Sequence, residues 1–361
     1  MASILIAPDS FKGSATSTQV AEALKQGWLA LRSYDEVTCV PFADGGEGTL
    51  DCVEGVSQLA QRIAITVQGA TGTEHLSSWL LVNGDTAVIE MAALCGITTV
   101  EKLDPLGAHS YGLGQAIKQA LEDIRVKEIL IAVGGSASTD GGTGALQALG
   151  YRFLDGVGDD VALGGGYLRE IVEIIAPENL LAPERGVKVL VDVQSPLIGE
   201  TGAAHIFAPQ KGADPQQVLL LDAGLAHLLQ LTGKQDQPGY GAAGGVSFGL
   251  SVLLGATIVS GVQTLATLIG LDQKIAGSDF VITGEGSFDA QSFSGKVVGY
   301  ILGRTQHKGV QAAIACGVNK AEVSYPVVAL VDLAPSTQSA ISDSQQWLFE
   351  AGKQLAAGFH H

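Results

Sequence analysis

Residues 3–17 read SILIAPDSFKGSATS, a short apolar run followed by Asp9, Ser10, Lys12 and Gly13 within five residues. The apolar run predicts a buried strand, and the helical spacing of apolar residues behind the loop predicts a helix over residues 18–31. A plain turn needs only the glycine or the aspartate. A carboxylate, a hydroxyl, an ammonium group and a glycine at the carboxyl end of a strand can also hold a phosphate and its metal ion.

Strand-like runs of the same character occur towards the other end of the chain. Residues 278–283, 311–315 and 327–331 are short, apolar and rich in β-branched side chains, and helix-length segments lie between them. Such runs are typical of buried parallel strands. We therefore expect both chain ends, residues 1–66 and 275–361, to form one domain with a doubly wound parallel sheet.

The middle of the chain, residues 67–274, is expected to form a second, inserted domain of mixed α/β structure. Near and within it, strands are expected over residues 60–68, 76–82, 86–90, 128–133 and 187–193, and a helix over 112–124. The turn Asn83-Gly84-Asp85 is a hairpin signature, so it predicts antiparallel pairing there. The expected fold class is thus α/β with two domains.

Composition excludes several functional classes. The 361 residues are 46% hydrophobic and 16% charged, with 48 glycines, as in a globular chain with many tight turns. The formal net charge of −17 argues against a nucleic-acid or acidic-membrane partner, because these need clustered Lys and Arg. Four separated cysteines predict reduced thiols in a cytoplasmic protein. No basic segment precedes the first strand, so no signal peptide is expected.

No charged residue occurs between Asp236 and Asp272, a length that would allow a membrane-spanning helix. The stretch is interrupted by glycines, among them Gly244, Gly245, Gly249, Gly255 and Gly261, and its ends have neither excess basic residues nor a Trp/Tyr pair. We therefore expect buried helices rather than a membrane span.

Glycine-rich loops with charged or hydroxyl side chains occur at residues 7–14, 43–49, 134–142, 192–199, 207–213, 238–245 and 283–296. Carboxylates in phosphate-receiving loops would repel the ligand unless a divalent cation lies between them, so these loops predict Mg²⁺ binding. The acidic candidates are Asp44, Glu47, Asp140, Glu285 and Asp289, and the basic ones are Lys12, Lys211 and Lys296. This combination suits phosphoryl transfer, which needs positioning and charge neutralisation.

The loops also allow other interpretations. The segment 292–297, SFSGKV, lacks the glycine and hydroxyl positions of a P-loop, and the GEG at 284–286 is only part of a dinucleotide fingerprint. Read singly, Asp9, Asp44 and Asp140 could be helix caps or Asx turns. The seven histidines show no zinc-ligand spacing, and His360 and His361 at the chain end carry no argument.

Five blocks, APDSFKGS, ADGGEGT, PQKGA, GYGAAGG and TGEGSFDAQ, occur in this order between residues 7 and 291. They resemble the signatures of the bacterial glycerate kinase family of the type that makes 2-phosphoglycerate. The resemblance implies two α/β domains, one Rossmann- or flavodoxin-like and built from both chain ends, with an active-site cleft between them. It also implies that ATP with Mg²⁺ phosphorylates D-glycerate. Ser138, Thr139, Ser195 and Ala208 depart from the family pattern but mostly keep a hydroxyl or a small side chain.

With this resemblance, roles can be predicted for the loop residues. The catalytic candidates are Lys12 and an aspartate that accepts the hydroxyl proton, Asp192 in preference to Asp140. The metal candidates are Asp44, Glu47, Glu285 and Asp289. The phosphate- or substrate-binding candidates are Asp9, Ser10, Gly134, Gly135, Ser136, Lys211, Gly284, Gly286 and Lys296. Backbone amides at 134–136 and 284–286 would stabilise charge on the transferred phosphoryl group.

Alternatives remain open from the sequence. The chain could be a glycerate 3-kinase or a kinase of a related hydroxy or sugar acid. A nicotinamide-dependent hydroxy-acid dehydrogenase would use the GEG segment, but Gly303 and Arg304 stand where its acidic residue belongs. A sugar-acid sensor without catalysis is a third possibility. The expected partners are D-glycerate and ATP, without nucleic acid or membrane, and a homodimer is left open.

Overall fold

The computed structural model describes residues 1–293 and 296–359. His360 and His361 lie outside these residues. The chain divides into two compact units: unit 1 comprises residues 1–44, 51–58 and 262–361, and unit 2 comprises residues 45–50 and 59–261. The boundaries expected at 66 and 275 fall inside strand β3 (Ala60–Gln68) and helix α10 (Leu271–Ala276), so the predicted domain ranges stay a proposal.

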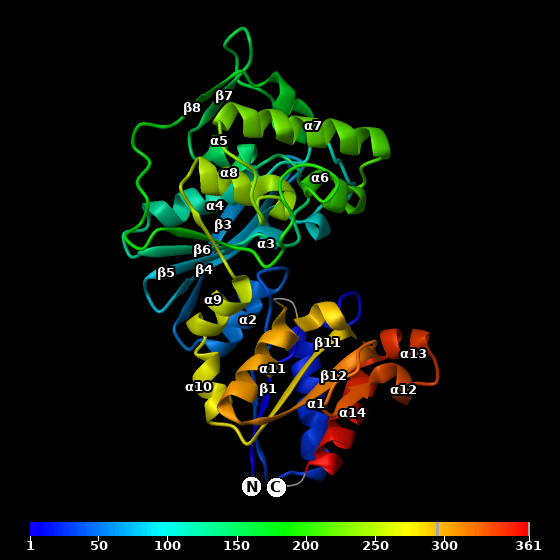
Figure 1. Ribbon diagram of the computed structural model, residues 1–361. Coiled ribbons are helices and arrows are strands. Elements are labelled where there is room, and N and C mark those ends of the chain that lie inside the picture. Colours follow the sequence, from blue (N-terminus) through cyan, green and yellow to red (C-terminus); the bar gives the residue numbers. More distant parts are fainter. Residues whose placement is uncertain (294–295, 360–361) are drawn as a thin grey trace. The chain divides into compact units, whose positions relative to one another are not determined.

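Unit 1 is built on a parallel sheet whose strands come from both ends of the chain (Figure 1). In sheet order they are β13 (Val327–Ala329), β12 (Gln311–Asn319), β11 (Phe280–Phe288), β1 (Ser3–Ile6) and β2 (Glu36–Cys39). β1 is parallel to both neighbours, with Leu5 opposite Val281 and Thr38. The predicted parallel sheet from both chain ends is confirmed.

Amphipathic helices cover this sheet. α1 (Ser17–Leu31) begins at a capping box in which Thr16 and Gln19 exchange hydrogen bonds. It packs on α14 (Ser344–Gly358), and both helices share an apolar core with alternate residues of β1 and β11. Figure 1 shows α11 (Val297–Lys308) and α10 on the other side of the sheet. The short helices α12 (Leu330–Leu333) and α13 (Thr337–Ser342) lie against α14.

Gly27 allows α1 and α14 to approach closely, because a Cβ atom built there would lie 2.0 Å from the Phe349 carbonyl oxygen. We expect Gly27→Ala to lower the free energy of unfolding by about 1–3 kcal/mol, since the helices must move apart. Gly303→Ala in α11 is the matched control, because its Cβ would meet no atom within 4 Å. That variant should gain about 0.5–1 kcal/mol from better helix propensity. Urea unfolding of both compares them, and equal stability would contradict this close packing.

Unit 2 holds a mixed sheet. In sheet order its strands are β10 (Thr257–Val259), β9 (Val187–Leu190), β6 (Glu128–Ala132), β5 (Thr86–Glu90), β4 (Glu74–Val82) and β3. The strands from β10 to β5 are parallel, whereas β4 is antiparallel to both β5 and β3. In the β4–β5 turn, Asn83 and Gly84 have φ angles of 54° and 79°, as a type I′ turn requires. The predicted hairpin is confirmed.

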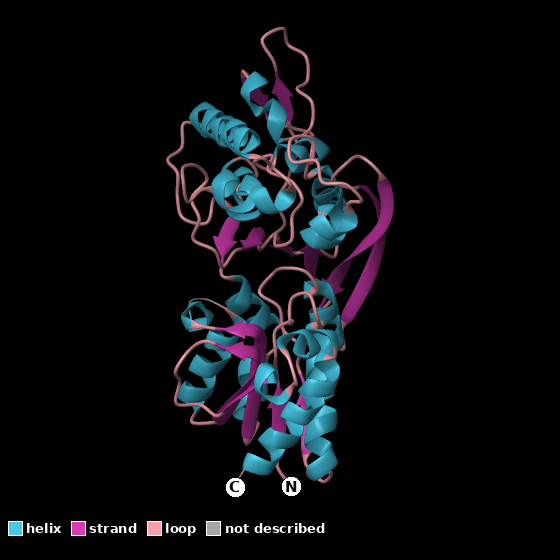
Figure 2. Ribbon diagram, turned by 90° about the vertical axis from the view of Figure 1, so that its right-hand side faces the viewer, coloured by secondary structure: helices cyan, strands magenta, loops and turns pink. Residues whose placement is uncertain are grey.

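Helices and a small second sheet complete unit 2, and Figure 2 shows how helices pack against the strands within each unit. The elements are α3 (Met91–Cys95), α4 (Tyr111–Glu122), α5 (Thr143–Ala148), β7 (Arg152–Leu154), β8 (Glu173–Ile175), α6 (Ala203–Phe207), α7 (Pro215–Thr232) and α8 (Val246–Val252). Helices α2 (Thr49–Val56) and α9 (Gly261–Leu268) begin in unit 2 and continue in unit 1.

The uncharged stretch after Asp236 forms α8, β10 and α9 rather than one long helix. Within residues 1–293 and 296–359, no helix combines the length and the apolar character that crossing a bilayer requires.

Candidate active site

The loop after β1 presents Lys12 at its tip. Phe11 and Ala15 exchange backbone hydrogen bonds of 2.8 and 3.0 Å, so residues 11–15 form a narrow turn. Gly13 has a φ of 81°, which glycine adopts without strain. Phe11 is buried and anchors the turn, whereas Lys12 is exposed. The fold thus places the positively charged side chain of Lys12 just beyond the carboxyl end of β1.

Three carboxylates belong to neighbouring strands of this sheet, and we call them the acidic cluster. Asp9 follows β1, Asp44 follows β2, and Glu285 lies in the second half of β11. The Asp9 N–H donates to the Gly284 carbonyl oxygen at 2.8 Å, which holds the first loop against β11. Burial, and next the negative charge of Asp44, raise the pKa of Asp9 to about 7, and Glu285 adds to the effect. A bound cation would relieve this repulsion.

Glu285 is the most enclosed member of the acidic cluster, at 8% exposure. Burial raises the pKa of its carboxyl group, and a hydrogen bond from Ser292, followed by the positive charges of Lys296 and Lys12, opposes that rise. Its Oε2 atom lies 4.0 Å from Lys296 Nζ. Its Oε1 atom is buried and has no hydrogen-bond partner among the described residues. Such an oxygen is a ready acceptor for a cation or a ligand hydroxyl.

The acidic cluster fits a divalent cation only in part. In the described part of the chain, no three carboxylates, thiols or imidazoles converge on a complete metal site. Mg²⁺ commonly binds proteins through one or two carboxylates and takes its other ligands from phosphate and water. Glu285 Oε1, which has no hydrogen-bond partner among the described residues, matches that mode of binding. The repulsion of Asp9 by Asp44 and Glu285 also matches it.

We expect Asp9→Asn to raise the free energy of unfolding at pH 8, without Mg²⁺, by about 1–3 kcal/mol. The folded-state pKa of Asp9, about 7, lies above its ordinary value of 3.8, so wild-type stability falls as the pH rises between these values. The amide keeps an acceptor for the Ser10 N–H, which now donates to Asp9 Oδ1 at 2.6 Å. Urea unfolding at pH 4.5 and 8 in EDTA measures the gap. A gap of the same size at both pH values would show that Asp9 titrates normally.

Two predicted phosphate-binding glycines lie within a strand instead of a loop. β11 extends to Phe288, not to residue 283 as expected, and therefore includes Gly284 and Gly286. A Cβ atom at Gly284 would lie 1.8 Å from the Ala315 carbonyl oxygen, so the close approach to β12 requires glycine. Asp289 makes an Asx turn in which its Oδ1 accepts from the Gln291 N–H at 2.8 Å. Their binding roles stay predictions.

In unit 2, Lys211 lies beneath the loop that follows β6. The residue is 3% exposed, and its Nζ donates to Ser136 Oγ at 2.7 Å and to the Ser138 carbonyl oxygen. Burial lowers the pKa of Lys211 to about 7, because a charged amine loses its hydration there. Lys211 therefore braces the loop that sequence analysis assigned to anion binding.

Asp140 is fully buried and its carboxylate is saturated with donors. These are the N–H and hydroxyl of Ser110, both at 2.7 Å, the Ser138 hydroxyl at 3.3 Å, and the N–H groups of Gly142 at 3.1 Å and Gly144 at 3.2 Å. The carboxylate thus ties the loop to the starts of α4 and α5. This arrangement favours a structural role over proton transfer.

Asp192 lies beyond β9, which ends at Leu190 rather than at residue 193 as expected. Its side chain is half-buried, and Oδ1 accepts from the Ser260 hydroxyl at 2.8 Å and the Gly261 N–H at 3.1 Å. Asp192 thus stands where the parallel strands β9 and β10 end, next to the start of α9. Ligands collect at such strand ends in open α/β sheets.

Glu90, which sequence analysis did not single out, organises the loop at residues 45–50. It is the last residue of β5, is 5% exposed, and accepts from the N–H groups of Gly48 at 3.0 Å and Leu50 at 2.9 Å. The same loop carries Glu47, a predicted metal ligand, which is exposed. The one sequence signal for a role of Glu90 is its place at the carboxyl end of the apolar run TAVIE, residues 86–90.

The glycines of the loop after β6 allow close packing on the loop at residues 45–50. The Gly134 N–H donates to the Gly45 carbonyl oxygen at 3.0 Å, so this predicted anion donor is used within unit 2. A Cβ atom at Gly134 would lie 2.5 Å from Gly46 Cα. Gly135 has a φ of 75°, which also favours glycine.

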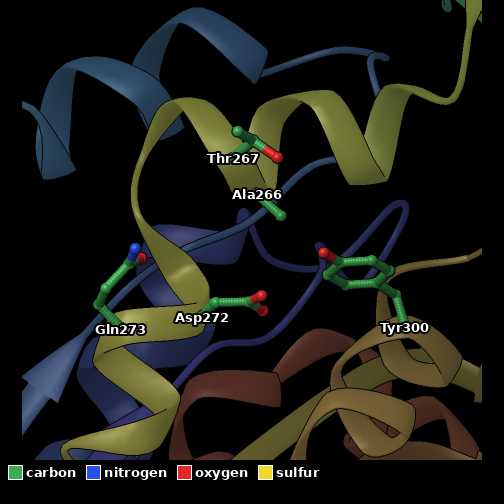
Figure 3. Close-up of a pocket in the computed structure, with 5 residues that line it drawn as sticks. All are labelled: Ala266, Thr267, Asp272, Gln273 and Tyr300. Atoms are coloured by element: carbon green, nitrogen blue, oxygen red, sulfur yellow. The ribbon is translucent and has the colours of Figure 1, made fainter.

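A pocket of about 100 Å³ in unit 1 lies among α9, α10 and α11 (Figure 3). Its lining residues are Ala266, Thr267, Asp272, Gln273 and Tyr300. Arg304 Nε donates to Asp272 Oδ1 at 2.7 Å, and burial followed by the Asp272 charge raises the pKa of Tyr300. Arg304 is therefore engaged in an ion pair.

A parallel sheet in unit 1 and a mixed sheet in unit 2 are followed by loops that carry lysines and carboxylates, and this arrangement fits an α/β phosphotransferase. The comparisons agree with this class. The glycerate kinase family model matches residues 4–360, and the chain belongs to the glycerate kinase family.

Relatives support this assignment along nearly the whole chain. The sequence is 41% identical over 304 residues to a glycerate 2-kinase of Escherichia coli strain K12, covering 81% of this chain and 79% of the relative. It is 35% identical over 374 residues to a glycerate kinase of Halalkalibacterium halodurans, covering 99% and 98%. A crystal structure of a glycerate kinase 2 candidate from Salmonella typhimurium LT2 matches with a TM-score of 0.80 at 30% identity, covering 99% and 97%.

Proposed function

We propose that the protein transfers the γ-phosphoryl group of ATP to the 2-hydroxyl of D-glycerate, with Mg²⁺, and forms 2-phosphoglycerate and ADP. The observation that carries this proposal is the 41% identity to a relative named glycerate 2-kinase. The acidic cluster and its lysines in unit 1, and the Lys211-braced loop in unit 2, supply the types of group that phosphoryl transfer needs.

Unit 1 receives the phosphates in this proposal. Mg²⁺, when bound, would neutralise phosphate charge, and Asp44 and Glu285 would hold it, with Asp289 as a further candidate. The exposed Glu47, the remaining predicted metal ligand, belongs to unit 2. Lys12 and Lys296 bind phosphate oxygens, and Ser10 donates a hydrogen bond to them. Asp9 keeps the first loop on β11 and helps to retain the cation.

Unit 2 binds the acceptor in this proposal. Ser136 donates its hydroxyl to the carboxylate of glycerate, and Asp192 accepts the proton of the 2-hydroxyl as the oxygen attacks phosphorus. Because Asp140 already accepts hydrogen bonds from Ser110, Ser138 and two loop amides, Asp192 is the better base.

The nicotinamide-dependent alternative loses support. Its GEG segment lies inside β11 rather than at a strand–helix turn, and Arg304 is paired with Asp272. All four cysteines lie in the described residues and none is part of a disulfide, which supports the proposed cytoplasmic location. A homodimer stays a proposal.

A ³¹P and ¹³C NMR assay with D-glycerate and ATP, in Mg²⁺ and in EDTA, tests the function. We expect a 2-phosphoglycerate signal in Mg²⁺ and none in EDTA. A 3-phosphoglycerate signal would keep the kinase and reverse the regiochemistry. Intact ATP with D-glycerate and with related hydroxy acids would refute the kinase proposal.

A further inference from the structure

The side chain of Lys211 is a buried base with no acidic partner. Its contacts are the Ser136 hydroxyl and the Ser138 carbonyl oxygen, both neutral, and it makes no ion pair among the described residues. A buried ammonium group without a counter-ion is strongly disfavoured unless an anion completes its surroundings. The amine therefore has no anionic group in direct contact with it.

The titratable groups around Lys211 offset its burial only in part. The charge of Asp140 favours the ammonium form, but Asp140 makes no direct ion pair with Lys211 in the described part of the chain, and burial still lowers the pKa of Lys211 to about 7. Burial raises the pKa of the Cys95 thiol to about 12, so the thiol is neutral. Burial also lowers the pKa of His109, which keeps that imidazole neutral at neutral pH.

The protonation state of Lys211 determines what Ser136 can do. A charged Nζ has only donors, so Ser136 Oγ accepts from it and keeps its own proton for a ligand oxygen. A neutral Nζ has a lone pair, and the Ser136 hydroxyl can turn to donate to it. The loop then presents no hydroxyl proton to an anion.

We propose that Lys211 is a positioning residue for the carboxylate of the acceptor, and that this carboxylate and a proton on Lys211 bind to unit 2 together. The inference rests on the proposed function, because it takes glycerate as the anion. Lys211 acts through Ser136 and need not touch the substrate. The affinity for glycerate should therefore fall as Lys211 loses its proton, with the pKa of about 7 placing that loss near neutral pH.

Isothermal titration calorimetry of the full chain with D-glycerate, without nucleotide, tests the linkage. We expect binding about 10–30-fold weaker at pH 8.5 than at pH 6. In two buffers of different protonation enthalpy, proton uptake should approach one per glycerate at pH 8.5 and be small at pH 6. Absence of binding at pH 6, or pH-independent affinity without uptake, would overturn the inference.

Variants separate Lys211 from Asp9, the other group whose pKa lies near 7. Lys211→Met, which is similar in length and uncharged, should bind weakly at all pH values and take up no proton. Asp9→Asn should keep the uptake. If Lys211→Met does not fold, loss of uptake in Asp9→Asn would still overturn the inference.

The two proposals fail differently. Phosphorylation of glycerate without proton uptake would leave the kinase proposal intact and remove the role of Lys211. Proton-linked binding of D-glycerate without any phosphorylated product would keep the anion site and remove the kinase proposal.

Discussion

Replacing Asp192 by Asn should lower kcat about 10³-fold, with a smaller change in the KM for D-glycerate. The carboxylate is half-buried at the ends of β9 and β10, and it is the aspartate proposed to take the proton from the attacking hydroxyl. An amide cannot accept that proton. Because Asn keeps an oxygen that can accept from Ser260 and Gly261, the start of α9 should remain intact. Steady-state kinetics and urea unfolding of the same preparation measure both effects.

Two controls accompany this prediction. Ser260→Ala removes one hydrogen bond to Asp192 and should lower kcat far less than Asp192→Asn does. Asp140→Asn places an amide NH₂ among groups that all donate to Asp140, so its main effect should be a loss of stability of about 2–4 kcal/mol. The opposite result would be a stable Asp140→Asn variant with 10³-fold lower kcat and an Asp192→Asn variant with nearly full activity. That result would make Asp140 the proton acceptor and Asp192 a structural residue.

Replacing Lys12 by Ala should lower kcat about 10²–10³-fold while changing the free energy of unfolding by less than about 0.5 kcal/mol. Lys12 is exposed at the tip of a turn that Phe11 anchors, so the fold does not depend on its side chain. Its charge acts on Asp9 and Glu285, which indicates that the ammonium group lies near the acidic cluster. In the Lys12→Ala variant, the proposed phosphate site would lose a positive charge that helps to neutralise the transferred phosphoryl group.

Lys308→Ala is the matched control for Lys12. That lysine is also exposed and lies in the last turn of α11, just before the amino end of β12, whereas Lys12 lies beyond the carboxyl end of β1. We expect its kcat to remain within twofold of wild type. Full activity of Lys12→Ala would remove Lys12 from the proposed phosphate site, and a loss of stability of several kcal/mol would make the loop a structural element.

Strand periodicity and turn chemistry allowed most of the fold to be predicted. The apolar runs at both chain ends became one parallel sheet, and the Asn83-Gly84 pair became the predicted turn. The end of β11 was missed, because a segment with Gly284 and Gly286 looks like a loop. Its strand form depends on pairing with β12, which begins 23 residues after β11 ends.

The candidate site was predicted as a set of residue types but not as an arrangement. Sequence placed Asp140 and Asp192 on almost equal terms as proton acceptors. The hydrogen bonds that distinguish them come from Ser110, 30 positions from Asp140, and from Ser260, 68 positions from Asp192. The capping role of Glu90 depends on amides 40 or more positions away.

The sequence by itself determined the α/β class, the parallel strands from both ends and the loops that carry lysines and carboxylates, because periodicity and turn preference are properties of neighbouring residues. Only the tertiary structure decided which carboxylates repel one another, which aspartate is saturated with hydrogen bonds, and that Lys211 is buried with only neutral groups in direct contact. The reason is physical: burial, hydrogen-bond saturation and charge proximity arise from residues far apart in the chain, such as Lys211 and Ser136, 75 positions apart.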